Sequence, residues 1–492
     1  MKQKSLKPQS PAYHPPGLGT CLEQLKTKLP ADAVVTDQGD LASSSHDFSY
    51  HSPRLPHAVV TCSSESQVID VLKTCNQHSV PVIPWTAGTS LEGHTIPSRI
   101  GGLLVDVSKM DKILAIHPKD LDCVVQPGIG WMRLNTELNK HGLFFPPDAG
   151  GGACIGGMCA TSCSGTFAWR YGTMKENVIG IKAVLPDGTV VKTKRRPHKS
   201  SAGYDLTHLF IGSEGTLGVI TEITLKLKRL PVETQIARVQ FETIREAAQL
   251  VEAIVAAGGM SVERLELMDD LTVKSVNLAY KTTLPEKTTL LMEFAGSSNA
   301  IKEQSTKVKE LAQQFRSISF DVSSNQKEAN ELWSVRKRAF FASKHLHPDP
   351  NSVSILTTDV CVPPSHLAEI LEITKKDLVE SNLIGSIVAH AGDGNFHVFL
   401  LTDKLHRDQD QLRRVEEFRD RMAKRALAMD GTVTGEHGIG KGKMKLLVEE
   451  LGENAIELMR KIKDAVDPNG IMNPGKVFWT KKWLTILGAS KL

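Results

Sequence analysis

The sequence predicts an α+β protein of two or three domains, and three observations lead to this fold class. At 492 residues the chain is too long for one ordinary hydrophobic core. Short β-branched runs alternate with stretches whose apolar residues recur at helical spacing, and glycine clusters separate them. The alternation is too irregular for a clean series of βαβ units, although an α/β arrangement stays open as the alternative.

The block from Pro56 to Pro231 is rich in glycine and in short strand-like runs. Its pattern predicts a helix over residues 68–78, a turn over 186–188, and strands over 80–84, 102–107, 123–126, 179–185 and 219–228.

After Pro231 the pattern changes to an alternation of strands and longer helices. We expect strands over 239–241 and 288–294, a turn over 468–475, and helices over 244–257, 302–315, 413–429 and 455–466. This alternation predicts an antiparallel sheet with helices packed on one face. The expected organisation is an extension with a first helix (1–50), a first domain (51–231), a second domain (232–470) and a closing segment (471–492).

Composition excludes several classes of protein. Lys plus Arg (59) and Asp plus Glu (55) nearly balance at +4, which argues against nucleic-acid binding but leaves anionic substrates open. The eight cysteines are scattered without paired spacing, which favours free thiols in a reducing compartment. Because no run of about 18 apolar residues exists, we expect no membrane-spanning helix.

The two chain ends each allow two interpretations. The first acidic residue is Glu23, and Lys2, Lys4 and Lys7 precede it, so the start is either a mitochondrial presequence or a disordered tail. The last residues, 478–492, form a mixed apolar and basic segment. They predict an ordinary terminal helix, with peripheral contact to a membrane surface as the alternative.

Four glycine-containing segments carry the first functional signal: residues 85–93, 150–157, 162–166 and 213–218. Glycine lets backbone N–H groups turn toward one point and approach a ligand closely, which suits a pyrophosphate. A single such loop is usually a plain turn. Four loops in one block indicate a large phosphate-bearing cofactor.

A second signal lies around Asp393-Gly394, which separates two strand-like runs in residues 386–400. If this pair forms a two-residue hairpin turn, His390 and His397 face each other directly, with Cβ atoms about 4.5–5.5 Å apart. Two neutral imidazoles so placed can share a metal ion. Purely structural histidines are the alternative.

A third signal is Glu436-His437, bracketed by glycines within residues 432–442. A loop there lets both side chains serve one site, whereas an extended strand would point them to opposite faces. Two histidines and one carboxylate with open positions suit Zn²⁺, Mn²⁺ or Fe²⁺. An unremarkable solvent-exposed glycine loop is the alternative.

The first block resembles the FAD-binding domain of the vanillyl-alcohol-oxidase family, which is not a Rossmann fold. The resemblance rests on residues 81–93, 125–128, 147–148, 155–158, 170–173 and 212–218. It implies a two-subdomain FAD-binding domain whose FAD-contacting residues are Pro84, Trp85, Thr86, Ala87, Gly88, Thr89, Ser90, Gly93, Pro147, Asp148, Gly151, Gly156, Gly157, Thr161, Ser164, Gly165, Tyr171, Gly172, Glu214, Gly218 and Ile220.

Some positions depart from the pattern of that family. Thr86 and Ala87 stand where glycine is usual, Ala149 where proline is common and Phe167 where asparagine is common. Some relatives tether FAD covalently through a histidine in the first loop. The corresponding positions here are Thr89 and Ser90, and His94 is displaced by several residues, so we expect FAD to be bound non-covalently.

The rest of the chain is similar to the C-terminal domain of FAD-linked D-lactate, D-2-hydroxyglutarate and glycolate dehydrogenases. This resemblance implies that His390, His397 and Glu436 bind a divalent metal, Zn or Mn, and that His437 is the catalytic base. Residues 332–336 match the segment whose arginine binds the substrate carboxylate, which assigns Arg336. Residues 358–363 and 473–476 also match, and Asn473 in the closing segment is expected to return to the flavin.

The match is strongest to dehydrogenases of the mitochondrial, cytochrome-linked kind that act on D-lactate. It implies oxidation of a small D-2-hydroxy acid by hydride transfer to flavin, with cytochrome c or an electron-transfer flavoprotein as acceptor. A mitochondrial location is expected, otherwise a cytoplasmic one, with the chain a monomer or dimer. The alternatives are a D-2-hydroxyglutarate or glycolate dehydrogenase, a non-redox ether-lipid synthase that contains FAD, and a non-catalytic flavin- or metal-binding module.

Overall fold

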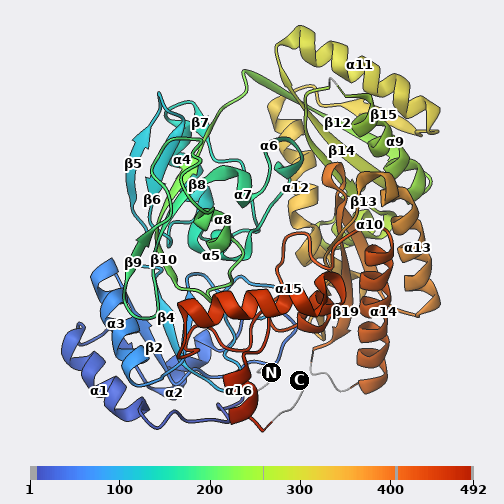
Figure 1. The fold of residues 1–492 in the computed structure, drawn as a ribbon. Coiled ribbons are helices and arrows are strands. Elements are labelled where there is room, and N and C mark those ends of the chain that lie inside the picture. The colour runs from blue at the N-terminus through green and yellow to red at the C-terminus, as the bar shows by residue number, and fades with distance from the viewer. Residues whose placement is uncertain (1–7, 259, 405–407, 489–492) are drawn as a thin grey trace. The chain divides into compact units, whose positions relative to one another are not determined.

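The computed structural model describes residues 8–258, 260–404 and 408–488. Their backbone forms two compact units (Figure 1). Unit 1 contains residues 166–171 and 231–435, and unit 2 contains residues 8–165, 172–230 and 436–488. The domain boundaries given above stay predictions.

Unit 2 contains two separate sheets. In the first, the strand order is β1-β2-β4-β3, and β4 pairs in parallel with both β2 and β3. These strands are β1 (Val34–Val35), β2 (Ala58–Thr61), β3 (Val82–Trp85) and β4 (Leu103–Asp106). Helices α1 (Leu18–Lys28) and α3 (Glu65–Gln77) share one apolar core with this sheet, which also includes Ile471 and Met472 near the C-terminus.

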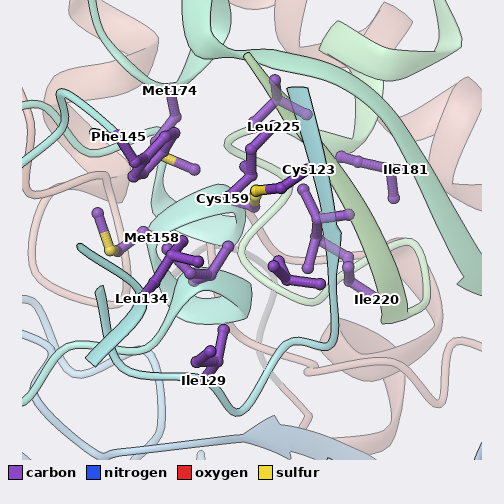
Figure 2. Packing of buried hydrophobic residues seen from close by; sticks show 14 of the residues in the cluster. Cys123, Ile129, Leu134, Phe145, Met158, Cys159, Met174, Ile181, Ile220 and Leu225 are labelled. Carbon is purple, nitrogen blue, oxygen red and sulfur yellow. The ribbon is translucent and has the colours of Figure 1, made fainter. Parts of the chain in front are cut away.

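The second sheet of unit 2 is antiparallel, in the order β5-β6-β10-β8-β9. Its strands are β5 (Ile113–His117), β6 (Asp122–Val125), β8 (Val178–Val184), β9 (Val190–Lys192) and β10 (Val219–Lys226). Figure 2 shows the core that they share with α4 (Trp131–Asn139) and α5 (Ile155–Thr161), where Cys159 lies beside Cys123 and Leu225, and Leu134 and Met158 belong to the same cluster. Two further short strands, β7 (Leu143–Phe144) and β11 (Lys228–Arg229), form a separate antiparallel pair.

The remaining described helices of unit 2 are short, except for one. They are α2 (Gln38–Leu41), α7 (Met174–Asn177), α8 (Leu206–Phe210), α15 (Met444–Val466) and α16 (Lys481–Ile486), with a 3₁₀ turn at Ala42–Ser44. Gly452 interrupts α15 with a positive φ of 76°, so the predicted helix over 455–466 is the second segment of a longer, kinked element.

Unit 1 is built on one eight-stranded antiparallel sheet in the order β15-β12-β14-β13-β18-β19-β16, with β17 also paired to β19. The strands are β12 (Glu233–Phe241), β13 (Val262–Met268), β14 (Thr288–Gly296), β15 (Ser319–Val322), β16 (Val353–Thr357), β17 (Val360–Cys361), β18 (Gly385–His390) and β19 (Asn395–Asp403).

The helices of unit 1 cover this sheet. They are α6 (Ala168–Tyr171), α9 (Ile244–Ala257), α10 (Asp270–Tyr280), α11 (Ser298–Gln314), α12 (Gln326–Ala342), α13 (Leu367–Glu380) and α14 (Gln409–Ala428), with 3₁₀ turns at Ser343–Leu346, Pro364–His366 and Ala391–Asp393. Thr243 and Glu246 start α9 with a reciprocal capping box, which explains why its boundaries follow from sequence.

One face of the sheet packs on α10 and α12. Alternate strand residues Met268, Leu291, Val388 and Phe399 share a core with Trp333 of α12. Every residue of β13 and β18 is buried, however, including those that point to the opposite face. The prediction of helices on one face only was therefore wrong, because both faces of the central strands are covered.

The α+β prediction is confirmed, and each predicted strand or helix has a counterpart within a few residues. One glycine segment was misassigned: residues 150–154 are irregular, but Ile155–Thr161 is a helix. All eight cysteines are free thiols. None of the described helices is long and apolar enough to cross a bilayer. Lys2, Lys4 and Lys7 of the proposed presequence lie outside the described residues, as do residues 489–492.

Candidate active site

The predicted FAD-contacting segments lie against one another within unit 2. A Cβ built on Gly157, at the start of α5, would lie 3.2 Å from Thr86 Oγ1 in the first glycine loop. One built on Gly215 would lie 3.0 Å from Pro84 Cγ, at the end of β3. These contacts show that three segments far apart in sequence approach each other at glycines.

Two further glycines permit backbone contacts that no side chain would allow. A Cβ on Gly165 would lie 2.3 Å from Asp148 Oδ1, and one on Gly218 would lie 2.7 Å from the carbonyl oxygen of Val184. Glycine at these positions therefore lets the segments that carry the predicted FAD-contacting residues pack closely against one another. This arrangement fits FAD.

A buried ion pair joins these segments. His94 Nε2 lies 3.2 Å from Glu214 Oε2, and both side chains are almost fully buried. Glu214 also accepts hydrogen bonds from the backbone N–H groups of Ile439 (2.6 Å) and Gly440 (2.8 Å). Burial alone would raise the pKa of Glu214, but His94 and the two N–H groups lower it below its usual value.

The environment of His94 bears on how the flavin is held. Its Nδ1 shares a hydrogen bond with Ser90, while Nε2 faces Glu214. Burial would lower the pKa of His94, yet Glu214 raises it. Both ring nitrogens are engaged by protein groups, so this histidine is poorly placed to be a covalent flavin ligand.

The closing segment lies within the same set of contacts. Asn473 Nδ2 donates to the carbonyl oxygens of Glu214 (2.8 Å) and His94 (3.2 Å), and its backbone N–H donates to Val82 (2.7 Å). Lys476 Nζ donates to the carbonyl oxygen of Ile96 (2.8 Å). Asn473 therefore links the first loop, the 213–218 segment and β3.

The hairpin that carries His390 and His397 has a different register from the predicted one. Ala391–Asp393 forms a 3₁₀ turn and Gly394 has φ +82°, so four residues separate the strands. His390 pairs with Asn395, and His397 pairs with Val388. The direct cross-strand pairing was wrong. Because the shift is by two residues, both histidines still lie on one face, as diagonal neighbours with ring centroids 5.5 Å apart.

Each of these buried rings has its Nδ1 held by an acceptor. His390 Nδ1 donates to Glu266 Oε1 at 2.7 Å, and His397 Nδ1 donates to the carbonyl oxygen of Thr358 at 3.1 Å. In neutral rings this places the lone pair on Nε2 in both cases. A carboxylate or carbonyl behind each imidazole is the usual support of a metal-binding histidine, so the donor set fits a Zn²⁺ or Mn²⁺ site.

Glu436 and His437 belong to unit 2. Ser164, another predicted FAD-contacting residue, donates from Oγ to Glu436 Oε2 at 2.6 Å. His437 Nε2 lies 3.7 Å from Glu436 Oε1, and both side chains are mostly buried. The carboxylate is thus oriented by Ser164, and the predicted base stands beside the predicted metal ligand.

Arg336 extends from α12 in unit 1, on the sheet face that carries both histidines. Its Nε donates to Glu266 Oε2 at 2.7 Å, and its side chain is 12% exposed. No hydrogen bond of its two Nη groups is found among the described residues. The end of the guanidinium therefore keeps the paired donors that a carboxylate needs.

Sequence reasoning missed a buried charged group that packs on Trp333 of α12. Arg264 lies between the rings of Phe167 (4.3 Å to its centroid) and Trp333 (3.8 Å), and it pairs with Glu293. Glu266, two residues further along β13, was also missed. The sequence alone gives no sign that the charged residues of 262–268 are buried, and only the structure shows that Glu263, Arg264 and Glu266 all are.

The predicted residues divide between the two units. Tyr171, Arg336, His390 and His397 are in unit 1. Glu436, His437 and the other predicted FAD-contacting residues are in unit 2, namely Pro84, Trp85, Thr86, Ala87, Gly88, Thr89, Ser90, Gly93, Pro147, Asp148, Gly151, Gly156, Gly157, Thr161, Ser164, Gly165, Gly172, Glu214, Gly218, Ile220 and Asn473. Phe167, one of the departures from the family pattern, packs on Arg264 of unit 1.

Comparison with known proteins assigns both parts of the chain. Residues 56–194 match the family model for an FAD binding domain, and residues 230–477 match that for the C-terminal domain of FAD linked oxidases. The chain is 45% identical over 458 residues to the mitochondrial D-lactate dehydrogenase [cytochrome] of Arabidopsis thaliana, covering 93% of this chain and 79% of that protein.

Two solved structures share the fold. p-Cresol methylhydroxylase with bound substrate superposes with a TM-score of 0.79 at 17% identity, covering 96% of this chain and 98% of the other. Alkyldihydroxyacetonephosphate synthase gives a TM-score of 0.72 at 17% identity, covering 95% of this chain and 87% of the other. With its two family matches and its 45% identity to the plant enzyme, the chain belongs to the FAD-linked oxidase family, as a relative of the cytochrome-type D-lactate dehydrogenases.

Proposed function

We propose that the protein is an FAD-dependent dehydrogenase that oxidises D-lactate to the 2-oxo acid and passes the electrons to cytochrome c. The Arabidopsis relative, a mitochondrial D-lactate dehydrogenase [cytochrome], supports D-lactate as the substrate, a cytochrome as the acceptor and a mitochondrial location. The observation that carries the proposal is the arrangement on one face of the unit 1 sheet. There, one buried glutamate, Glu266, accepts hydrogen bonds from both His390 and Arg336, and the carbonyl oxygen of Thr358 accepts one from His397.

The metal ligands we propose are His390, His397 and Glu436. Gly435 is the last residue of unit 1, and a Cβ on it would lie 2.1 Å from Asn395 Nδ2. Asn395 is the strand partner of His390. Glu436 directly follows Gly435 in the chain, and consecutive Cα atoms are about 3.8 Å apart. The position of Gly435 beside the strand partner of His390 therefore supports Glu436 as the third ligand.

The chain's own residues then have distinct tasks. When bound, FAD supplies a hydride acceptor and the divalent ion supplies a Lewis acid for the substrate hydroxyl. Arg336 binds the carboxylate through its two Nη groups and so fixes the orientation of the Cα–H bond. His437 accepts the hydroxyl proton as the Cα–H bond breaks. Ser90 and Glu214 hold His94 in place, which supports non-covalent FAD.

The test is anaerobic mixing of the purified flavoprotein with D-lactate, followed by the flavin absorbance. D-Lactate should bleach the flavin rapidly, whereas L-lactate should not. The His437→Ala variant should retain FAD, but its rate of bleaching should fall by about 10²-fold or more, since general-base catalysis contributes roughly that much. Bleaching by D-2-hydroxyglutarate or glycolate instead would identify another substrate. No bleaching by any hydroxy acid would exclude a dehydrogenase.

A further inference from the structure

Glu266 occupies an unusual position for a carboxylate. It lies in β13, the central strand of unit 1 in which every residue is buried, and its own exposure is 0%. Its two oxygens accept 2.7 Å hydrogen bonds from different residues: Oε2 from Arg336 Nε and Oε1 from His390 Nδ1. One buried carboxylate thus connects two residues to which the proposed function gives different tasks.

The backbone fixes this connection. Glu266 is the direct strand partner of His390 in the β13–β18 pairing, so the two Cα atoms have a set separation. Arg336 reaches the same carboxylate from α12, one helical turn after Trp333, which packs in the core of that face. The three side chains are therefore held by sheet register on one side and by helix packing on the other.

The hydrogen bonds to Glu266 restrict both partners. A carboxylate accepts the Nδ1 proton of His390 and so keeps the ring in the tautomer whose Nε2 is the metal-binding atom. It also fixes Arg336 through Nε, and neither Nη group of Arg336 has a hydrogen bond among the described residues. Neither restriction requires Glu266 to touch the substrate or a metal ion.

We infer that Glu266 is a positioning residue that aligns the metal ligand His390 and the carboxylate-binding Arg336 together. The inference rests on the proposed function for the roles of its two partners. Its consequence is that one substitution, at a residue to which the proposed function gives no ligand of its own, should weaken metal binding and substrate binding at once. A carboxylate that only balanced the buried charge of Arg336 would leave metal affinity unchanged.

Glutamine at this position is a sharp probe. A carboxylate can accept from two donors, but an amide offers one acceptor oxygen and an NH₂ group that donates. If the amide oxygen serves Arg336, the NH₂ group faces His390 Nδ1 and favours the tautomer with the proton on Nε2. That tautomer cannot bind a metal through Nε2.

Glu293 provides a matched control. It lies on the neighbouring strand β14, is 5% exposed, and also pairs with a buried arginine, Arg264. Its other described hydrogen bond is from Trp333 Nε1 at 3.0 Å. Glu293→Gln therefore disrupts a buried glutamate–arginine pair in the same sheet, and Glu293 is hydrogen-bonded to neither His390 nor Arg336.

The experiment compares Glu266→Gln and Glu293→Gln as full-length flavoproteins, stripped of metal and titrated with Zn²⁺ against a chromogenic chelator. Thermal unfolding and flavin absorbance confirm that both are folded. We expect the Zn²⁺ dissociation constant to rise 10- to 100-fold in Glu266→Gln, the range seen when such supporting groups are lost, and less than about threefold in Glu293→Gln. The KM for D-lactate should rise in Glu266→Gln as well. Equal Zn²⁺ affinities in the two variants would overturn the inference.

A second pair of variants covers the case in which Glu266→Gln does not fold because Arg336 is left buried without its partner. Arg336→Gln alone keeps Glu266 on His390, whereas the double variant Glu266→Leu/Arg336→Gln removes both charges and leaves no acceptor at position 266 for His390 Nδ1. The double variant should bind Zn²⁺ at least tenfold more weakly than Arg336→Gln, and equal affinities would contradict the positioning role. The Zn²⁺ readout needs no turnover, so it remains decisive even if D-lactate fails to bleach the wild-type flavin.

Discussion

His57 is a single side chain whose protonation should be visible in the stability of the whole protein. Its Nδ1 accepts a hydrogen bond from the backbone N–H of Gly102 at 3.0 Å, which requires the unprotonated nitrogen. Burial, with the nearby His14 ring, lowers the pKa of His57 to about 4 from its usual 6.5. Between these two pH values the unfolded chain binds a proton that the folded chain does not.

The free energy of unfolding should therefore fall as the pH drops from 6.5 toward 4, and the His57 contribution should be complete above 6.5. This residue can change the free energy of unfolding by at most about 1.4 kcal/mol per pH unit. Solvent screening of the partly exposed ring makes the change smaller. His57→Asn keeps an acceptor for Gly102 but does not titrate. Urea unfolding at about pH 7 and about pH 5 should show a smaller loss in the variant; parallel losses would exclude His57 as the source.

At the same scale, the sequence revealed the reactive side chains but not their supports. His390, His397, Glu436 and His437 could be picked out because their spacing is local. Glu266 is 124 residues away from His390 along the chain. Such a partner becomes visible only when strand order is known, since β13 and β18 are adjacent in the sheet although they are far apart in sequence.

At the scale of elements, the hairpin shows what a local pattern leaves undetermined. Asp-Gly is compatible with a two-residue turn and equally with a longer loop that ends on a left-handed glycine. The structure has the longer loop, and the strand pairing shifts by two residues. Side chains alternate with a period of two, so the face of each histidine could be predicted while its direct partner could not.

The same loop allows a test of the register. A Cβ on Gly394 would lie 2.0 Å from the carbonyl oxygen of Val362, at φ +82°. Gly394→Ala should cost about 2 kcal/mol or more, because backbone strain and a backbone clash add. Gly142 has φ +69° but open space around its Cβ, so Gly142→Ala should cost only about 1 kcal/mol. Denaturant unfolding of both variants measures the difference, and equal costs would show that the clash is relieved.

At the scale of the whole molecule, the family assignment came from sequence because several short motifs agreed over most of the chain. The distribution of the functional residues over two units could not be predicted from the sequence. Residues 166–171 belong to unit 1 although residues on both sides belong to unit 2, and the chain re-enters unit 2 between Gly435 and Glu436. The points at which the chain passes between the units depend on long-range packing. The spacing of apolar residues within one segment carries no information about such packing.

This distribution predicts that metal and flavin can be removed separately. His390, His397 and Arg336 lie in unit 1, whereas the predicted FAD-contacting residues except Tyr171 lie in unit 2, where Ser164 holds Glu436 through a 2.6 Å hydrogen bond. Dialysis against a chelator should therefore withdraw the metal and leave FAD bound, while bleaching by D-lactate is lost. Gel filtration with flavin absorbance and metal analysis measures both contents. Adding back Zn²⁺ or Mn²⁺ should restore bleaching, and release of FAD together with the metal would contradict the separation.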